Sequence, residues 1–219
     1  LDRNLGLKKL INIKNQHNFL IREMSSEHEV LFSSLSLNSQ IKINKILEIG
    51  TFDGKNCFLL SALFDNSIIE TIDLEKQDDD FKKFYNRQDQ LDEFVDLRNN
   101  ILSKNKKITF NEMNSVKLFE VNKNYDLIWI DGAHGYPIVC FDIINSLKLI
   151  NKNGIIMCDD VYIDKINSDK MYFSNAAYET LNELKKANII NFHLIYKRID
   201  SKNNCDVKKR KFVAIIKKI

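Results

Sequence analysis

Residues 46–54, with the sequence ILEIGTFDG, decide the fold class of this chain. An apolar run that contains Glu48 is followed by two glycines, Gly50 and Gly54, which lie four residues apart. This pattern predicts a strand, a tight turn and a helix that begins near Lys55, because glycine adopts backbone conformations that sharp turns require. The amino end of a helix behind such a turn presents N–H groups that can hold a ligand.

Apolar runs farther along the chain predict six more strands. Most of them are short, rich in β-branched residues and almost unbroken by polar residues, which is typical of strands buried on both faces. They cover residues 67–73, 107–110, 126–131, 154–160, 192–196 and 212–216. Apolar residues at helical spacing fall between them, at 94–101, 139–150 and 177–184.

The alternation of these elements predicts an α/β fold. We expect a Rossmann-like, doubly wound sheet of seven strands, mostly parallel, with helices on both faces. The last two strands are expected to form an antiparallel hairpin, and the charges of residues 200–211 between them to form a solvated loop.

The whole chain, 1–219, is expected to form one domain. Residues 1–43 show no strand pattern and are predicted to be a helical extension packed on one edge of the core, which spans 44–219. This extension is a candidate surface for a homodimer. The acidic and aromatic segment 75–92 is interpreted as a solvated helix start with an apolar face; a lid over the active site is the alternative.

Composition argues against several classes of protein. A net charge of +3 is too small to indicate nucleic-acid binding, and no apolar run is long enough to cross a membrane. Charged residues interrupt the first ten positions, so no signal peptide is expected. The four cysteines show no C-x-x-C spacing, which favours reduced thiols in a cytoplasmic protein over disulfides or a zinc site.

Polar residues gather at the predicted carboxyl ends of the strands, where open α/β sheets bind ligands. Asp73 follows Gly54 by nineteen residues and can accept hydrogen bonds from both hydroxyls of a ribose. The G-x-G-x-x-G pattern that admits a pyrophosphate is missing. The sequence therefore suits a nucleoside cofactor without a pyrophosphate better than it suits NAD.

Residues 48–54 resemble the first motif of class I S-adenosylmethionine-dependent methyltransferases, and this resemblance covers residues 41–219. It implies S-adenosylmethionine as the cofactor. Many members carry Asp where this chain has Asn114. The residues that the resemblance assigns to the cofactor are Glu48, Gly50, Thr51, Gly54, Asp73, Asn114, Ser115 and Asp131.

Two later segments resemble the small-molecule and sugar O-methyltransferases of the macrocin type. Residues 125–136, YDLIWIDGAHGY, are similar to their D-G-x-H-x-Y segment, and residues 153–160, NGIIMCDD, to their fifth strand. In metal-dependent members, this resemblance implies Mg²⁺ bound by Asp131, Asp159 and Asp160. Converging carboxylates repel one another unless they are protonated, solvated or neutralised by a cation, and Mg²⁺ prefers oxygen ligands. Alternatively, Asp159 or Asp160 caps the next segment and Asp131 serves only the cofactor and the turn.

His134 is the only histidine at the carboxyl end of a predicted strand. Histidine titrates near neutral pH, so His134 is a candidate general base for a substrate hydroxyl, with Asp131 beside it. A structural role in the loop, or a role as a hydrogen-bond donor to the substrate, is the alternative. Trp129 is expected in the core, whereas Tyr136 and Tyr162 are expected to flank the site.

Together these patterns predict an S-adenosylmethionine-dependent, Mg²⁺-dependent O-methyltransferase that acts on a hydroxyl of a sugar or another small molecule. The acceptor is not identified by the sequence. An NAD-dependent oxidoreductase and a non-catalytic S-adenosylmethionine-binding protein remain as alternatives. A nucleic-acid methyltransferase is disfavoured, because the Asp/Asn-Pro-Pro-aromatic motif is absent after the fourth strand.

Overall fold

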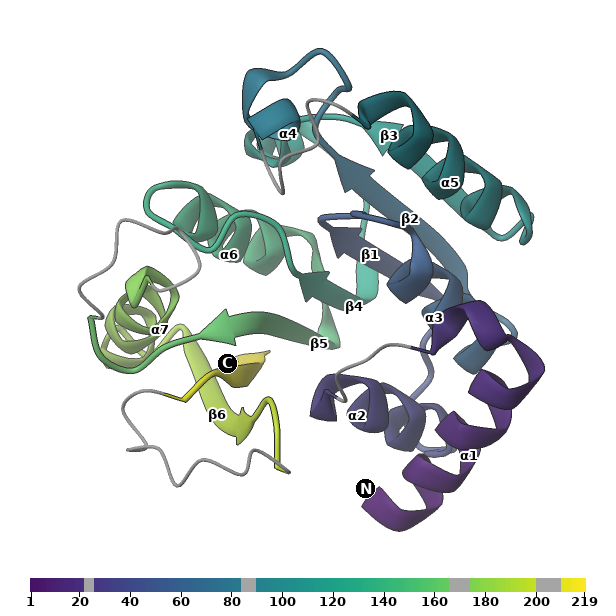
Figure 1. Cartoon of the computed structure of the whole chain (residues 1–219). Helices are drawn as coiled ribbons and strands as arrows, with labels where there is room; N and C mark the ends of the chain where they lie inside the picture. Colours follow the sequence, from purple (N-terminus) through teal and green to yellow (C-terminus); the bar gives the residue numbers. More distant parts are fainter. Residues whose placement is uncertain (22–25, 84–89, 166–173, 200–209) are drawn as a thin grey trace.

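A computed structural model describes residues 1–21, 26–83, 90–165, 174–199 and 210–219. Within these residues, seven strands form one sheet in the order β3-β2-β1-β4-β5-β7-β6 (Figure 1). The strands are β1 (Lys45–Ile49), β2 (Ile68–Asp73), β3 (Ile108–Glu112), β4 (Tyr125–Ile130), β5 (Ile150–Val161), β6 (Ile190–Tyr196) and β7 (Phe212–Lys218). β1 to β5 run parallel, and β7 runs antiparallel to β5 and β6. The predicted sheet and its C-terminal hairpin are confirmed.

Helices cover both faces of the sheet, as predicted. They are α1 (Arg3–Gln16), η1 (Asn18–Leu20), α2 (Glu27–Ser36), α3 (Lys55–Leu63), α4 (Asp79–Lys83), α5 (Leu91–Ser103), η3 (Ser115–Glu120), α6 (Ile138–Leu149) and α7 (Ala176–Lys186). One apolar core joins the sheet to α1, α2, α3 and α5. A second core joins the opposite face to η3, α6 and α7. No described helix combines the length and the apolar character that a membrane crossing demands.

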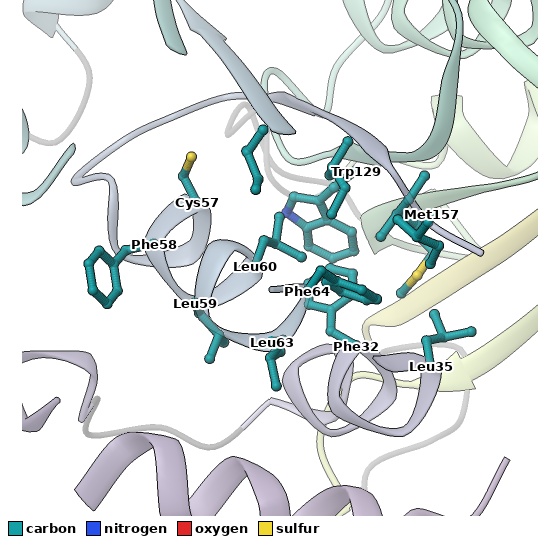
Figure 2. Packing of buried hydrophobic residues seen from close by; sticks show 14 of the residues in the cluster. Phe32, Leu35, Cys57, Phe58, Leu59, Leu60, Leu63, Phe64, Trp129 and Met157 are labelled. Carbon is teal, nitrogen blue, oxygen red and sulfur yellow. The ribbon is translucent and has the colours of Figure 1, made fainter. Parts of the chain in front are cut away.

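The amino-terminal helices do not pack where the sequence predicted. α2 lies on a face of the sheet, where Phe32 packs edge-on against Trp129 of β4 with 5.1 Å between ring centroids (Figure 2). His28 lies 4.7 Å from the same ring. The prediction of an edge position was wrong. Both α6 and α7 pack on the opposite face of the sheet, so no crossover helix covers β4, β5 and β7 on the face where α2 lies. Burying a side chain such as Phe32 stabilises the fold by about 1.5–3 kcal/mol.

Two other predictions fall partly outside the described residues. In segment 75–92, Asp79 and Asp80 are exposed and Phe81 is buried, as expected of a solvated helix start with an apolar face. Residues 84–89 of this segment lie outside the description, as do residues 200–209 of the predicted solvated loop and Cys205. The other cysteines, Cys57, Cys140 and Cys158, are free thiols.

Parallel pairing brings the ends of the strands to one edge. Ile49 at the end of β1 pairs with Ile72 of β2 and with Ile130 of β4. In the same way, Ile130 pairs with Cys158 of β5. The residues that follow each strand therefore meet above the middle of the sheet.

Candidate functional site

The turn after β1 is held against the end of β4. Gly50 has a positive φ of 98°, and its N–H donates to the carbonyl oxygen of Ile72 at 2.9 Å. A Cβ at this position would lie 2.3 Å from the carbonyl oxygen of Asp131. Glycine is required here because the backbone is left-handed and because the chain itself approaches so closely. Gly54, with a φ of 76°, precedes the first residue of α3.

Asp73, the last residue of β2, is hydrogen-bonded to the turn after β1. One carboxylate oxygen accepts a hydrogen bond from the N–H of Phe52 at 2.9 Å, and the other accepts one from the N–H of Leu74, also at 2.9 Å. A carboxylate oxygen can accept more than one hydrogen bond, so these contacts orient Asp73 without exhausting it as an acceptor. The predicted ribose-binding acid is thus fixed beside the glycine turn.

Glu48 lies inside the protein. Its side chain is fully buried and accepts hydrogen bonds from Asn56 at 2.8 Å and from Thr71 at 2.6 Å. The Thr71 hydroxyl also lies 2.7 Å from that of Thr51. This network ties β1, β2 and the start of α3 together below the turn. The hydrogen bonds of Asn56 and Thr71 to Glu48 were not predicted, because no sequence motif links these residues.

A pocket of about 440 Å³ opens beside Asp73, between the ends of β2 and β3. It is lined by Leu74, Glu75, Gln77, Asp78, Asn114 and Lys117. Asn114 accepts a hydrogen bond from the N–H of Val116 at 3.0 Å and so caps η3, which begins at Ser115. Asn114 is therefore held at the wall of this pocket, next to the predicted ribose acid.

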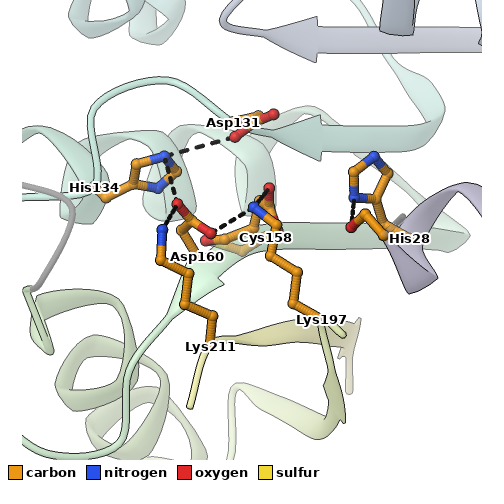
Figure 3. Close-up of polar contacts among 9 residues, drawn as sticks. His28, Asp131, His134, Cys158, Asp160, Lys197 and Lys211 are labelled. Carbon is orange, nitrogen blue, oxygen red and sulfur yellow. Dashed lines mark hydrogen bonds and ion pairs between the residues drawn. The ribbon is translucent and has the colours of Figure 1, made fainter. Parts of the chain in front are cut away.

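Asp131, His134 and Asp160 meet at the rim formed by the ends of β4 and β5 (Figure 3). Nε2 of His134 lies 3.6 Å from a carboxylate oxygen of Asp131 and 4.0 Å from one of Asp160. Burial lowers the pKa of His134, although Asp160 and Asp159 oppose this effect. The imidazole is therefore neutral near pH 7 and able to accept a proton.

Two lysines from the C-terminal hairpin enter the same rim (Figure 3). Nζ of Lys197 lies 2.6 Å from Asp159 and 2.5 Å from Asp160. Nζ of Lys211 lies 2.5 Å from the second oxygen of Asp160. Lys211 was expected in a solvated loop, and that prediction was wrong because its ammonium group is paired with Asp160. Both lysines were missed, since their sequence neighbours show only a charged stretch.

A distortion of β5 makes this pairing possible. Side chains of a regular strand alternate between faces, so Asp159 and Asp160 would point apart. Instead, the pairing of β5 with β7 shifts register between Cys158 and Val161, and Asp160 has a left-handed φ of 51°. Such irregularities are frequent next to functional sites. The distortion lets both carboxylates contact Lys197.

These residues do not fit the predicted Mg²⁺ site. Among the residues that the structure describes, no group of three or more His, Cys, Asp or Glu side chains is arranged to hold a metal ion. The carboxylates of Asp159 and Asp160 are instead neutralised by ammonium groups. Burial favours a neutral Asp160, but Lys197, His134 and Lys211 outweigh it and hold the pKa of Asp160 below its ordinary value. Partial desolvation and the Asp159 carboxylate raise the pKa of Asp131.

The aromatic residues near the site take different positions. Trp129 is fully buried in the core, as expected. Tyr162 is buried beside Lys211, whose Nζ lies 5.7 Å from the centre of its ring, and burial raises the pKa of Tyr162 to about 12. Tyr136 is 81% exposed. Of the two tyrosines, only Tyr162 is therefore packed into the rim.

Known proteins of the same fold bind S-adenosylmethionine. The O-methyltransferase TomG from Streptomyces achromogenes, solved with S-adenosylmethionine, superposes with a TM-score of 0.62 at 14% identity, over 97% of this chain and 89% of that chain. A putative caffeoyl-CoA O-methyltransferase from Staphylococcus aureus gives 0.59 at 16% identity, over 96% and 91%. An O-methyltransferase from Bacillus cereus in complex with S-adenosylhomocysteine gives 0.57 at 15% identity, over 98% and 90%. No curated protein matches the sequence significantly.

The sequence also matches a protein family. The family described as a methyltransferase domain matches residues 47–161, which is more than half of the 219 residues. The matched segment runs from the middle of β1 to the end of β5, so it contains the glycine turn, Asp73, Asp131 and His134. These findings confirm the resemblance to class I S-adenosylmethionine-dependent methyltransferases, and the chain belongs to the methyltransferase-domain family.

Proposed function

We propose that this protein transfers a methyl group from S-adenosylmethionine to a hydroxyl group of a small molecule. One observation carries the proposal: the Asp73-anchored glycine turn touches the Asp131–His134 rim through the close approach of Gly50 to Asp131. A cofactor seated on the turn would present its methyl group to the rim. The same fold in TomG, solved with S-adenosylmethionine, and in the Bacillus cereus enzyme, solved with S-adenosylhomocysteine, supports S-adenosylmethionine as the methyl donor.

The residues divide into two groups with respect to the cofactor. Asp73 would hold the ribose hydroxyls of the bound cofactor, Asn114 and Ser115 would contact its adenine, and Gly50, Thr51 and Gly54 would hold its amino-acid part. Glu48 acts from below, because its carboxylate is engaged with Asn56 and Thr71. Its role is to keep Thr51 and the turn in place.

The chemical step is a direct displacement. The acceptor hydroxyl oxygen attacks the methyl carbon of the sulfonium and forms the new C–O bond. The C–S bond breaks, and its electron pair stays on sulfur, giving neutral S-adenosylhomocysteine. The hydroxyl proton passes to the imidazole of His134.

The carboxylates beside His134 favour this proton transfer, against the burial that lowers the pKa of the imidazole. A positive charge forms on the imidazole within 3.6 Å of Asp131 and 4.0 Å of Asp160, and both carboxylates stabilise it. General-base help of this kind typically contributes about 10²–10⁴ in rate. Holding the two reactants in line can contribute about 7–11 kcal/mol more. The acceptor class that the sequence resemblance suggests is a sugar or another hydroxylated metabolite.

Replacement of His134 tests the assignment. His134→Ala should lower turnover at least tenfold in an assay of methyl transfer to a panel of hydroxylated metabolites, while calorimetry shows unchanged affinity for S-adenosylhomocysteine. His193→Ala is the matched control, because His193 is exposed on β6 and lies outside the rim. Unchanged turnover in His134→Ala contradicts the base role. A wild-type protein that binds NAD but not S-adenosylhomocysteine contradicts the proposed function.

A further inference from the structure

We propose that Lys197 and Lys211 take the place of a divalent cation in the rim, so that this enzyme works without metal and accepts a substrate through a single hydroxyl group. The statement about the substrate rests on the proposed methyl transfer. The statement about the lysines rests on the geometry of the rim alone.

The first support is the contact pattern. Lys197 bridges Asp159 and Asp160 at 2.6 and 2.5 Å, and Lys211 contacts the remaining oxygen of Asp160 at 2.5 Å. An ammonium group has three donors, so it can hold two carboxylates together as a metal ion does. The carboxylate side chains are only 2% and 9% exposed, which makes an unpaired charge there costly.

The second support is the charge of the rim. Asp131, Asp159 and Asp160 supply three negative charges when ionised, and the two ammonium groups cancel two of them. The lysines occupy both oxygens of Asp160 and one oxygen of Asp159, and of these two carboxylates only Oδ1 of Asp159 has no hydrogen-bond partner among the described residues. A divalent cation that binds Asp160 would have to displace both ammonium groups from it. Its binding would therefore compete with two short ion pairs that are already present.

The third support is the way in which the backbone places the lysines. Lys197 directly follows β6 and Lys211 directly precedes β7, and the N–H of Lys197 donates to the carbonyl oxygen of Lys211 at 3.0 Å. β7 pairs with β5 up to Val161, next to Asp160. The sheet register thus sets both lysine backbones beside the two acids.

This arrangement bears on the acceptor. A metal ion can chelate two adjacent oxygens of a substrate, and such an enzyme favours vicinal hydroxyls. Here the ammonium groups are committed to Asp159 and Asp160. Asp131 is about one-third exposed and lies beside His134, so these two side chains remain to contact one hydroxyl. Acceptors with a single hydroxyl should therefore be methylated as well as matched vicinal diols.

The experiment combines a metal titration with lysine replacement. Calorimetric titration of the wild-type protein with MnCl₂ should show no saturable binding, and turnover should be the same in EDTA and in Mg²⁺. Lys211→Met and the double variant Lys197→Met/Lys211→Met should show saturable Mn²⁺ binding at least tenfold tighter than the weakest binding that the wild-type titration could detect, because their carboxylates lose ammonium partners. Lys107→Met is the control, since Lys107 bonds carbonyl oxygens of Ser61 and Asp65 at the other end of β3.

The outcomes separate the two proposals. Saturable Mn²⁺ binding by the wild type, loss of turnover in EDTA, or a folded Lys211→Met variant with no tighter Mn²⁺ binding would overturn the replacement of the metal. Lys211 is the more exposed of the two lysines, so its single variant serves if the double variant does not fold. Failure of the wild type to bind S-adenosylhomocysteine would reject the methyltransferase function and leave the metal titration interpretable, because that titration needs no cofactor.

Discussion

Asp142 should make the stability of the protein depend on pH. It lies on α6, fully buried beneath the turn after β4, and a Cβ on Gly132 would lie 3.6 Å from its carboxylate. Neither of its oxygens has a hydrogen bond of ordinary geometry to a described residue, although the Ser115 hydroxyl lies near enough to act on the carboxylate. Burial raises the pKa of Asp142 from 3.8 to about 7, and the nearby Ser115 hydroxyl opposes part of this rise. The folded state therefore favours the neutral carboxyl group.

The sign and size of the effect follow from this difference. Below pH 3.8 the carboxyl is protonated in both the folded and the unfolded state, and it costs the fold no ionisation energy. As pH rises, the unfolded chain releases the proton first, so the free energy of unfolding falls until the folded state also ionises near pH 7. A difference of about three pKa units corresponds to a loss of about 4 kcal/mol.

Asp142→Asn removes this titration. Urea unfolding of the wild type and the variant at about pH 5 and about pH 8 should show that only the wild type loses the contribution of Asp142, about 3 kcal/mol between these values. The pH dependence is the readout, because a buried amide brings a desolvation cost of its own. Asp96→Asn, on the exposed face of α5, is the control. A difference between variant and wild type that is equal at both pH values would refute the reasoning.

Two further predictions concern the turn after β1. Gly50→Ala should destabilise the protein by about 2–3 kcal/mol or more in urea unfolding, because its Cβ would meet the Asp131 carbonyl in a left-handed backbone. Gly132→Ala is the matched control, since its Cβ would find the nearest atom at 3.5 Å; equal effects would contradict the steric argument. Asp73→Asn should weaken S-adenosylhomocysteine binding at least tenfold by calorimetry, because hydrogen bonds to a charged group contribute about 1.5–3 kcal/mol. Unchanged affinity would remove Asp73 from the ribose site.

The sequence predicted the strands well because their signal is local. Buried parallel strands are short apolar runs, and each predicted run overlaps a strand of the sheet. The boundaries of the strands were predicted less accurately. β5 begins at Ile150, whereas the prediction began at residue 154, because the first residues of this strand are polar and resemble a turn. Gly50 was recognised as a residue at a close approach, but its nearest neighbour is the backbone of Asp131, which only the folded sheet reveals.

The features that the sequence did not predict depend on contacts between distant segments. The position of α2 depends on which face of the sheet lacks a crossover helix, and residues 1–43 carry no sign of that. The two rim lysines face Asp159 and Asp160 only through the register of β5, β7 and β6. The three clustered acids favoured a metal ion as the neutralising charge. The sequence pattern does not indicate that Lys197 and Lys211 contact the same carboxylates.

The packing of α2 on β4 gives the protein an internal optical reporter. Trp129 is the only tryptophan in the chain, and its indole ring rests between the sheet and the side chains of His28 and Phe32. Its fluorescence therefore registers detachment of α2. Because Asp131 follows Trp129 by two residues, directly after the end of β4, the emission of this single fluorophore also reports on the strand that carries the rim.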